Sequence, residues 1–333
     1  KSDSVLSASG DRSSPLVSPV KTGKILLNTI GGYNWKSANQ YIRWNVVVPE
    51  DGLYTLSLKA RQNRSVGQPV YRALYINGEI PFKEAAQIRV DYSSKWQMKT
   101  LSNESGEYLF YLNKGENEIM LSATLGEFDT VVRMMDNAVV ELNSIYRQLL
   151  VLLGSEPDLS KDYKLEKIVP ELIKNLGAQA DKLEVISDTY EKLNGGKNAL
   201  TATLQTLVRQ LRKMSGDADK IPSEFSYFKT NIGSLGTNLA LAKEQPLEVD
   251  YFILASESPT LPKYKAGFLA QLIFDIKEFA CSFVIDYKNI GTVDKNSSGT
   301  MITAWISSGR DQAQIIRGLV SDDFTPNTGH KVK

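Results

Sequence analysis

The strongest constraint on the fold is a double change in the spacing of apolar residues along the chain. Up to about Leu125, apolar and polar residues alternate, which is the period of half-buried β-strands. From Asp129 to about Lys243, apolar residues recur every three or four positions, as in helices with one buried face. At Leu247 the alternation returns. A helical region therefore lies between two stretches of strand pattern.

The strand pattern is clearest in residues 41–62, YIRWNVVVPEDGLYTLSLKARQ. Tyr41 to Val48 and Leu53 to Gln62 are predicted as two strands. The residues between them, PEDG, favour a tight turn, because proline fixes φ and glycine accepts positive φ. We therefore expect a hairpin here, within an antiparallel sandwich of about eight short strands. Asn77-Gly78 predicts a further hairpin.

The helical region has four apolar stripes, which predict an antiparallel four-helix bundle. Gly154 is placed to end the first helix and the sequence NGG to end the second. Pro170 is placed in the first turn of the second helix, and Ser223 is placed to cap the fourth. An even number of antiparallel helices returns the chain near its exit point. Leu247 to Ala255 is therefore expected to pair with a strand from residues 21–128.

These patterns predict a multidomain α+β chain. Its expected segments are residues 1–20, a linker or disordered arm; 21–128 with 246–257, the β-sandwich; 129–245, the inserted helical bundle; 258–300, an amphipathic helix and a linker; and 301–333, a βαβ unit. In the amphipathic helix, predicted over 265–287, one face carries Phe268, Leu272, Ile276, Phe279 and Phe283. We expect this face to be buried against a neighbouring domain; peripheral contact with a membrane surface is the alternative.

Composition excludes several classes of function. The formal net charge of +1 argues against a nucleic-acid-binding surface. One Cys (Cys281) and one His (His330) allow no intrachain disulfide, no His/Cys metal cluster and no nucleophile–base pair. No glycine-rich phosphate loop is present. We therefore expect no enzyme activity, no catalytic residue, no metal and no cofactor.

Three loops of the predicted sandwich carry aromatic, arginine and asparagine residues that suit a glycan, because aromatic faces stack on sugar rings and polar groups bond hydroxyls. The candidates are Tyr33, Asn34 and Trp35; Arg61, Asn63 and Arg64; and Tyr92 and Trp96. Burial of Trp35 and Trp96 in the sandwich core is the alternative. A fourth candidate site is the start of the last predicted helix, at Arg310 and Asp311. These two residues can equally form a capping salt bridge.

Two resemblances narrow the function. The order VPEDGLYTL, NGE and YLNKGENEIML, closed by LEVDYFILAS, resembles the galactose-binding-like jelly-roll sandwich of carbohydrate-binding modules. The final stretch, AWISSGRDQAQIIRGLVSDDFTPNTGHKVK, resembles the first βαβ of extracellular solute-binding proteins of carbohydrate ABC transporters. With KEQPLEVDY and YSSKWQMKTL, the chain is similar to large multidomain members of this class from Gram-positive bacteria.

The second resemblance implies that a carbohydrate ligand and the membrane subunits of an ABC permease are the partners. It also implies an extracellular, surface-associated protein, with a lipid anchor upstream and most of the sugar-binding lobe beyond Lys333. Two alternatives stay open at this point. The chain can be a surface carbohydrate-binding module of an adhesin or glycoside hydrolase, or a purely structural spacer.

Overall fold

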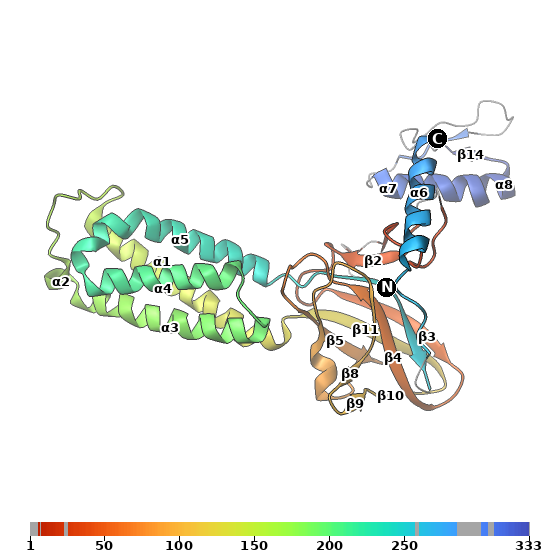
Figure 1. Cartoon of the computed structure of the whole chain (residues 1–333), viewed down its shortest axis with the longest axis horizontal. Helices are drawn as coiled ribbons and strands as arrows, with labels where there is room; N and C mark the ends of the chain where they lie inside the picture. The colour runs from red at the N-terminus through yellow and green to blue at the C-terminus, as the bar shows by residue number, and fades with distance from the viewer. Residues whose placement is uncertain are drawn as a thin grey trace.

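The computed structural model describes residues 6, 8–22, 26–256, 260–284, 301–305 and 310–332. A β-sandwich lies at the centre, a long helical bundle projects from one of its ends, and the C-terminal helices lie on another side (Figure 1). The architecture is therefore the mixed α+β arrangement that the sequence predicts.

The sandwich consists of two antiparallel sheets. The larger has the order β1 (Ala8–Ser9), β2 (Thr29–Gly32), β12 (Leu247–Ala255), β4 (Gly52–Arg61) and β10 (Phe110–Leu112), with β7 (Gln97–Thr100) also pairing with β4. The smaller has the order β3 (Tyr41–Val48), β11 (Gly115–Thr124), β5 (Val70–Ile76) and β6 (Ile88–Val90). Apolar side chains of both sheets, among them Ile42, Leu56, Leu74 and Leu121, meet in one buried core.

The predicted hairpin over residues 41–62 is wrong. β3 pairs with β11 along its whole length, whereas β4 pairs with β12, β7 and β10, so the turn after Val48 carries the chain from one sheet to the other. Both strands bury one face in the same core, and this burial places them opposite each other instead of side by side. The Asn77-Gly78 turn does form, with positive φ at both residues, but only a single bridge, between Ile76 and Glu79, follows it.

The bundle consists of α1 (Asp129–Leu153), α3 (Pro170–Asn194), α4 (Ala199–Gly216) and α5 (Ile221–Ala242), with a short α2 (Leu165–Ile168) in the connection between α1 and α3. Their apolar stripes form one continuous core. Gly154 and Gly195 end α1 and α3 with a φ of 78° each, as expected. The predicted cap at Ser223 is wrong. α5 begins two residues earlier, and the Ser223 hydroxyl donates to the Lys220 carbonyl at 2.8 Å.

The strand that follows the bundle closes the sandwich. β12 pairs antiparallel with β2 on one side and with β4 on the other, so the predicted pairing is confirmed. The bundle is therefore inserted between β11 and β12, two strands of the same sandwich.

The joint between the bundle and the sandwich, formed by Tyr71, Arg72, Phe128, Tyr190 and Gln245, combines aromatic packing with buried hydrogen bonds. The rings of Tyr71 and Tyr190 both pack against Phe128, with centroid distances of 5.9 and 5.1 Å. The Gln245 side chain accepts a hydrogen bond from the Tyr71 N–H at 2.8 Å, and its carbonyl accepts one from the Arg72 guanidinium at 2.7 Å. Side chains of the sandwich are thus fixed to the segment through which the bundle returns.

The N-terminal arm is not a linker over its described residues, which corrects the prediction for residues 1–20. β1 pairs with β2, and Val17 is buried. The arm lies on the outer face of β4 and β12, where Lys59 and Asp250 project, and polar groups of the arm bond to both. The contacts with Lys59 and Asp250 are made by backbone groups of the arm, the Leu16 carbonyl and the Ser18 N–H, so they require no apolar periodicity in its sequence.

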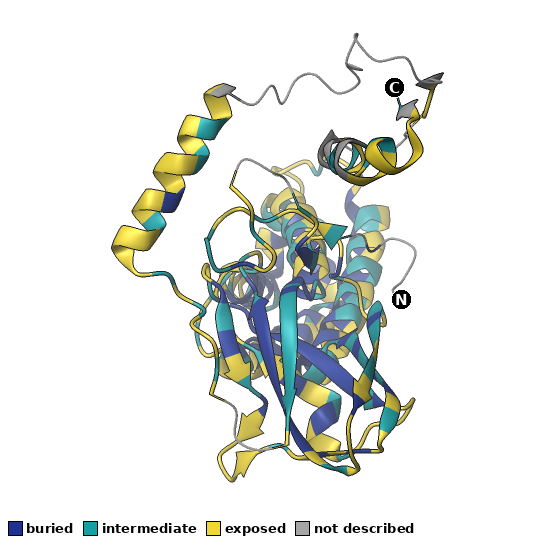
Figure 2. Ribbon diagram, turned by 90° about the vertical axis from the view of Figure 1, so that its right-hand side faces the viewer, coloured by how far each residue is buried: buried dark blue, intermediate teal, exposed yellow. Residues whose placement is uncertain are grey.

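The C-terminal part contains α6 (Phe268–Val284), α7 (Arg310–Leu319) and α8 (Thr325–Thr328). The predicted burial of one face of α6 is wrong: Phe268 is 80% exposed and Phe279 67% exposed, and most of this helix has the colour of exposed residues (Figure 2). The opposite face contacts the protein, since Gln271 donates to the Ser13 carbonyl at 3.1 Å and Arg12 lies 3.3 Å from the Glu278 carboxylate.

Two short strands, β13 (Met301–Ile302) and β14 (Lys331–Val332), pair in parallel with α7 between them, in the predicted strand–helix–strand order. No helix in the described part of the chain combines the length and the apolar character needed to cross a membrane.

Candidate functional site

The first predicted loop is only partly on the surface. Trp35 is 0% exposed, its indole N–H donates to the Gln40 carbonyl at 2.9 Å, and the Arg72 guanidinium lies 4.0 Å from its ring centre. Trp35 is therefore a core residue with no ring face for a ligand, which corrects its assignment. Tyr33 is 56% exposed and Asn34 is exposed, but the Lys36 ammonium lies 3.8 Å from the Tyr33 ring centre.

Trp96 and Arg61 come together, but beneath the N-terminal arm. The Trp96 indole N–H donates to the Asp11 carboxylate at 2.8 Å, and the Arg61 guanidinium lies 4.6 Å from the Trp96 ring centre. Arg61 also pairs with Glu248 at 2.7 Å. Trp96 is buried by these contacts, so its assignment as a ligand contact is corrected as well.

A second charged pair lies next to this cluster. The Lys59 ammonium and the Asp250 carboxylate are 2.7 Å apart, and both side chains are 0% exposed. The arm gives each of these side chains a further hydrogen-bond partner. Lys59 donates to the Leu16 carbonyl, and the Ser18 N–H donates to Asp250 at 3.2 Å. Burial raises the pKa of the Asp250 carboxyl, and the hydrogen bond with Lys59 opposes this shift. The cluster therefore holds the arm in place.

The remaining predicted residues lie in three places. Arg64 and Tyr92 are exposed and Asn63 is half-buried. The Gln62 side chain accepts from the Arg64 N–H at 3.0 Å and thereby fixes this loop. Arg310 and Asp311 are the first two residues of α7, whereas the loop before them, 306–309, lies outside the described residues. A ligand role for these five residues stays a prediction.

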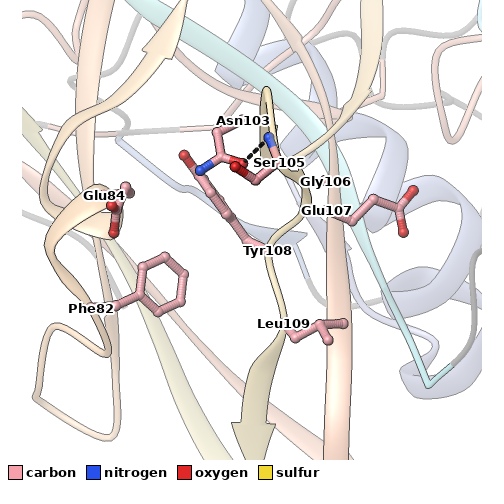
Figure 3. A pocket seen from close by; sticks show the side chains of 8 residues that line it. All are labelled: Phe82, Glu84, Asn103, Ser105, Gly106, Glu107, Tyr108 and Leu109. Carbon is pink, nitrogen blue, oxygen red and sulfur yellow. Dashed lines mark hydrogen bonds between the residues drawn. The ribbon is translucent and has the colours of Figure 1, made fainter.

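The structure contains a cavity of about 340 Å³ that sequence reasoning missed. It lies near the hairpin formed by β8 (Ser102–Asn103) and β9 (Gly106–Glu107), close to the N-terminal end of β4. The strand that follows the bundle, β12, begins beside the C-terminal end of β4. Its walls come from two segments: Phe82 and Glu84 on one side, and Asn103, Ser105, Gly106, Glu107, Tyr108 and Leu109 on the other (Figure 3).

Aromatic contacts anchor this cavity in the core. Phe110 is buried, Phe82 stacks on it with ring centres 5.3 Å apart, and Tyr108 packs edge-on against Phe82 at 5.2 Å. The Tyr108 N–H donates to the Leu101 carbonyl at 2.8 Å, which fixes its backbone. The Tyr108 ring is therefore a half-buried surface in a defined orientation.

Polar groups of both walls surround this ring. Asn103 accepts from the Ser105 N–H at 2.9 Å and shapes the turn between β8 and β9 (Figure 3). Partial burial, with the nearby Glu84 carboxylate, raises the pKa of the Tyr108 hydroxyl. An aromatic face with hydroxyl, amide and carboxylate groups around it suits a ligand that has both an apolar face and many hydroxyls.

The sequence contained a weak signal for this cavity. Phe82 follows the Asn77-Gly78 turn, and Tyr108 follows the polar stretch SNESGE, so both aromatic residues lie outside regular strands. Within the described residues, no group of three or more His, Cys, Asp or Glu side chains is arranged to hold a metal ion.

Comparison with protein families gives a match over the helical insertion. Residues 130–245 match the family model described as the bacterial solute-binding protein, 4-helix bundle domain. The bundle is similar to that domain. The match begins one residue after α1 starts and ends two residues before β12, so it covers the insertion and leaves the sandwich outside.

Comparison with solved structures gives matches that cover about a third of the chain or less. A family 35 carbohydrate binding module from Clostridium thermocellum is 16% identical with a TM-score of 0.26, over 36% of this chain and 77% of that chain. CBM35 from Paenibacillus barcinonensis is 12% identical with a TM-score of 0.26, over 37% and 86%. A ruminal GH26 endo-beta-1,4-mannanase is 24% identical with a TM-score of 0.21, over 26% and 16%. A comparison with curated proteins gives no match.

Proposed function

We propose that this chain is the accessory, amino-terminal part of an extracellular bacterial protein that captures a carbohydrate and delivers it to an ABC importer. The observation that carries the proposal is the four-helix insertion, which is similar over residues 130–245 to the bundle domain of bacterial solute-binding proteins. The strand–helix–strand unit from β13 to β14 supports it, since such units build the lobes of two-lobed binding domains.

In this proposal the protein is not an enzyme, and each part has a separate role. The sandwich is a binding module, and its aromatic cavity offers the chemistry of a glycan site. The bundle is a spacer whose two ends are fixed to the sandwich. The permease subunits of the importer are the partners, and a lipid anchor upstream holds the protein at the cell surface.

The second candidate is a surface carbohydrate-binding module of an adhesin or glycoside hydrolase, which the same cavity would serve. The two candidates differ in what the cell loses with the gene. Uptake of labelled oligosaccharides is measured in cells of the source bacterium with the gene, without it, and with it restored. Delivery to an importer predicts loss and recovery of uptake. Unchanged uptake together with lost attachment to polysaccharide contradicts delivery and supports the module.

A further inference from the structure

The cavity beside β8 and β9 has a chemical character that restricts its ligand. Its lining includes the Glu84 carboxylate, and none of the eight lining residues, all within the described part of the chain, is Lys, Arg or His. The carboxylate of the other acidic lining residue, Glu107, points away from Phe82 and Glu84 (Figure 3). The Glu84 carboxylate therefore gives one wall a hydrogen-bond acceptor with a negative charge. Hydroxyl and ammonium groups can donate to carboxylates, whereas a ligand carboxylate would be repelled by them.

The geometry explains how a sugar ring can fit. The Phe82 and Glu84 side chains project from one wall, and the Tyr108 and Asn103 side chains from the other (Figure 3). A ring that packs against Tyr108 thus places its edge between Glu84 and Asn103. The volume of about 340 Å³ lies at the small end of ligand cavities, roughly 300–1,000 Å³, which suits one or two sugar rings.

We propose that this cavity binds a neutral or amino-substituted sugar unit of a glycan and discriminates against uronic acids, an inference that rests on the proposed function. Tyr108 supplies the face on which the ring packs. Glu84 accepts hydrogen bonds from the ring substituents and excludes carboxylated sugars. All eight lining residues belong to the sandwich.

Two substitutions test the two parts of this proposal, each with a control from the same region. Tyr108→Ala removes the ring; Tyr111→Ala removes a tyrosine that is 59% exposed on β10 and does not line the cavity. Glu84→Gln neutralises the wall, and Glu104→Gln neutralises an exposed carboxylate in the β8–β9 turn that does not line the cavity. Tryptophan fluorescence of every variant verifies the fold.

Binding to the chain is measured by calorimetry with neutral oligosaccharides (gluco-, manno- and xylo-oligosaccharides), chitosan oligosaccharides and oligogalacturonates. We expect binding of a neutral or amino series and no binding of the uronates. Tyr108→Ala is expected to lower affinity by about tenfold or more, and Tyr111→Ala to leave it within about twofold. Glu84→Gln is expected to reduce the difference in affinity between neutral and uronate ligands, and Glu104→Gln is expected to leave this difference unchanged.

Each contrary result overturns the inference. It is wrong if uronates bind as well as neutral sugars, if Tyr108→Ala binds normally, or if the wild-type chain binds none of the series. The proposed function is judged separately, by uptake in the deletion strain. Lost uptake with no binding at the cavity refutes the inference alone, and unchanged uptake with cavity binding refutes delivery alone.

Discussion

The Lys59–Asp250 ion pair allows a sharp prediction, because both side chains are fully buried and both bind the N-terminal arm. Lys59→Met keeps an unbranched side chain of similar length on β4 but leaves the Asp250 carboxylate without its cation. A buried charge without its partner is strongly unfavourable. We expect the free energy of unfolding of the sandwich to fall by about 3–5 kcal/mol.

The control is a pair in the same sandwich that water can screen. Arg43 and Glu118 lie 3.1 Å apart on neighbouring strands, and each side chain is about one-third exposed. Exposed pairs contribute about 0–1 kcal/mol, so Arg43→Met is expected to stay within that range. The double variant Lys59→Met/Asp250→Leu removes both buried charges and is expected to recover most of the loss.

Urea unfolding followed by tryptophan fluorescence suits this measurement. Trp35, Trp44 and Trp96 lie in the sandwich, and the fourth tryptophan, Trp305, is 95% exposed and lies elsewhere. The fluorescence change therefore reports mainly on the sandwich. A loss below 1 kcal/mol in Lys59→Met, or a double variant no more stable than the single one, would refute the assignment of this pair as a buried, mutually dependent ion pair.

Three further predictions test other parts of the structure. Gly126→Ala is expected to cost about 2 kcal/mol or more, since its φ is +54° and a new Cβ would lie 2.4 Å from the Tyr71 ring; Gly233→Ala in α5, with open space around it and no positive φ, is the control in thermal unfolding. Replacing residues 130–243 by a short Gly/Ser linker is expected to leave a folded sandwich by circular dichroism, whereas ending the chain before the bundle is expected to leave it unfolded, because β12 is lost. Finally, burial raises the pKa of the Asp250 carboxyl in the folded protein, so at a pH between 3.8 and this raised pKa the folded state holds more protons at Asp250 than the unfolded state does. The contribution of Asp250 to the free energy of unfolding therefore falls as pH rises through this interval. Relative to Asp250→Asn, the wild type is expected to gain stability as pH is lowered from about 7 towards 4, and a constant difference would contradict the shift.

The insertion could be predicted from sequence because each of its signals is local. The alternation from Leu247 to Ala255 marks a strand, the four apolar stripes mark helices, and an even number of helices brings the chain back. Gly154 and Pro170 are placed where the structure has a helix end and a helix start. None of these signals depends on a distant part of the chain.

Strand partners could not be predicted in the same way. The turn chemistry at PEDG shows where the chain reverses, but not whether the two flanking strands pair or face each other across a core. β3 instead finds an eight-residue partner in β11, which lies more than sixty positions further along the chain. The choice depends on which faces are buried together, and that is a property of the whole sandwich.

The candidate sugar-binding loops illustrate a similar limit. Aromatic residues in polar loops are typical both of binding sites and of caps over a core. Trp35 and Trp96 are caps here, because each indole N–H finds an acceptor inside, at Gln40 and Asp11. Asp11 lies in the segment expected to be an arm without structure, so no sequence signal showed that it would cover Trp96.

The joint between bundle and sandwich gives the insertion a mechanical consequence. Arg72 is buried and faces no carboxylate within hydrogen-bonding distance among the described residues; burial lowers its pKa to about 9, and its donors reach the carbonyls of Tyr71, Trp35 and Gln245. These three carbonyls are the hydrogen-bond partners of the buried guanidinium, which also lies over the Trp35 ring. Bending at the joint would withdraw the Gln245 carbonyl and leave a buried donor unsatisfied.

The two connections of the bundle strengthen this restraint. The chain enters through Phe128, whose ring packs on Tyr71 of the sandwich, and returns through Gln245, which bonds to the same residue. An insertion held at both ends, over a buried polar and aromatic joint, cannot swing as a domain on a single linker does. The two connections and the buried joint therefore restrain the orientation of the bundle relative to the sandwich.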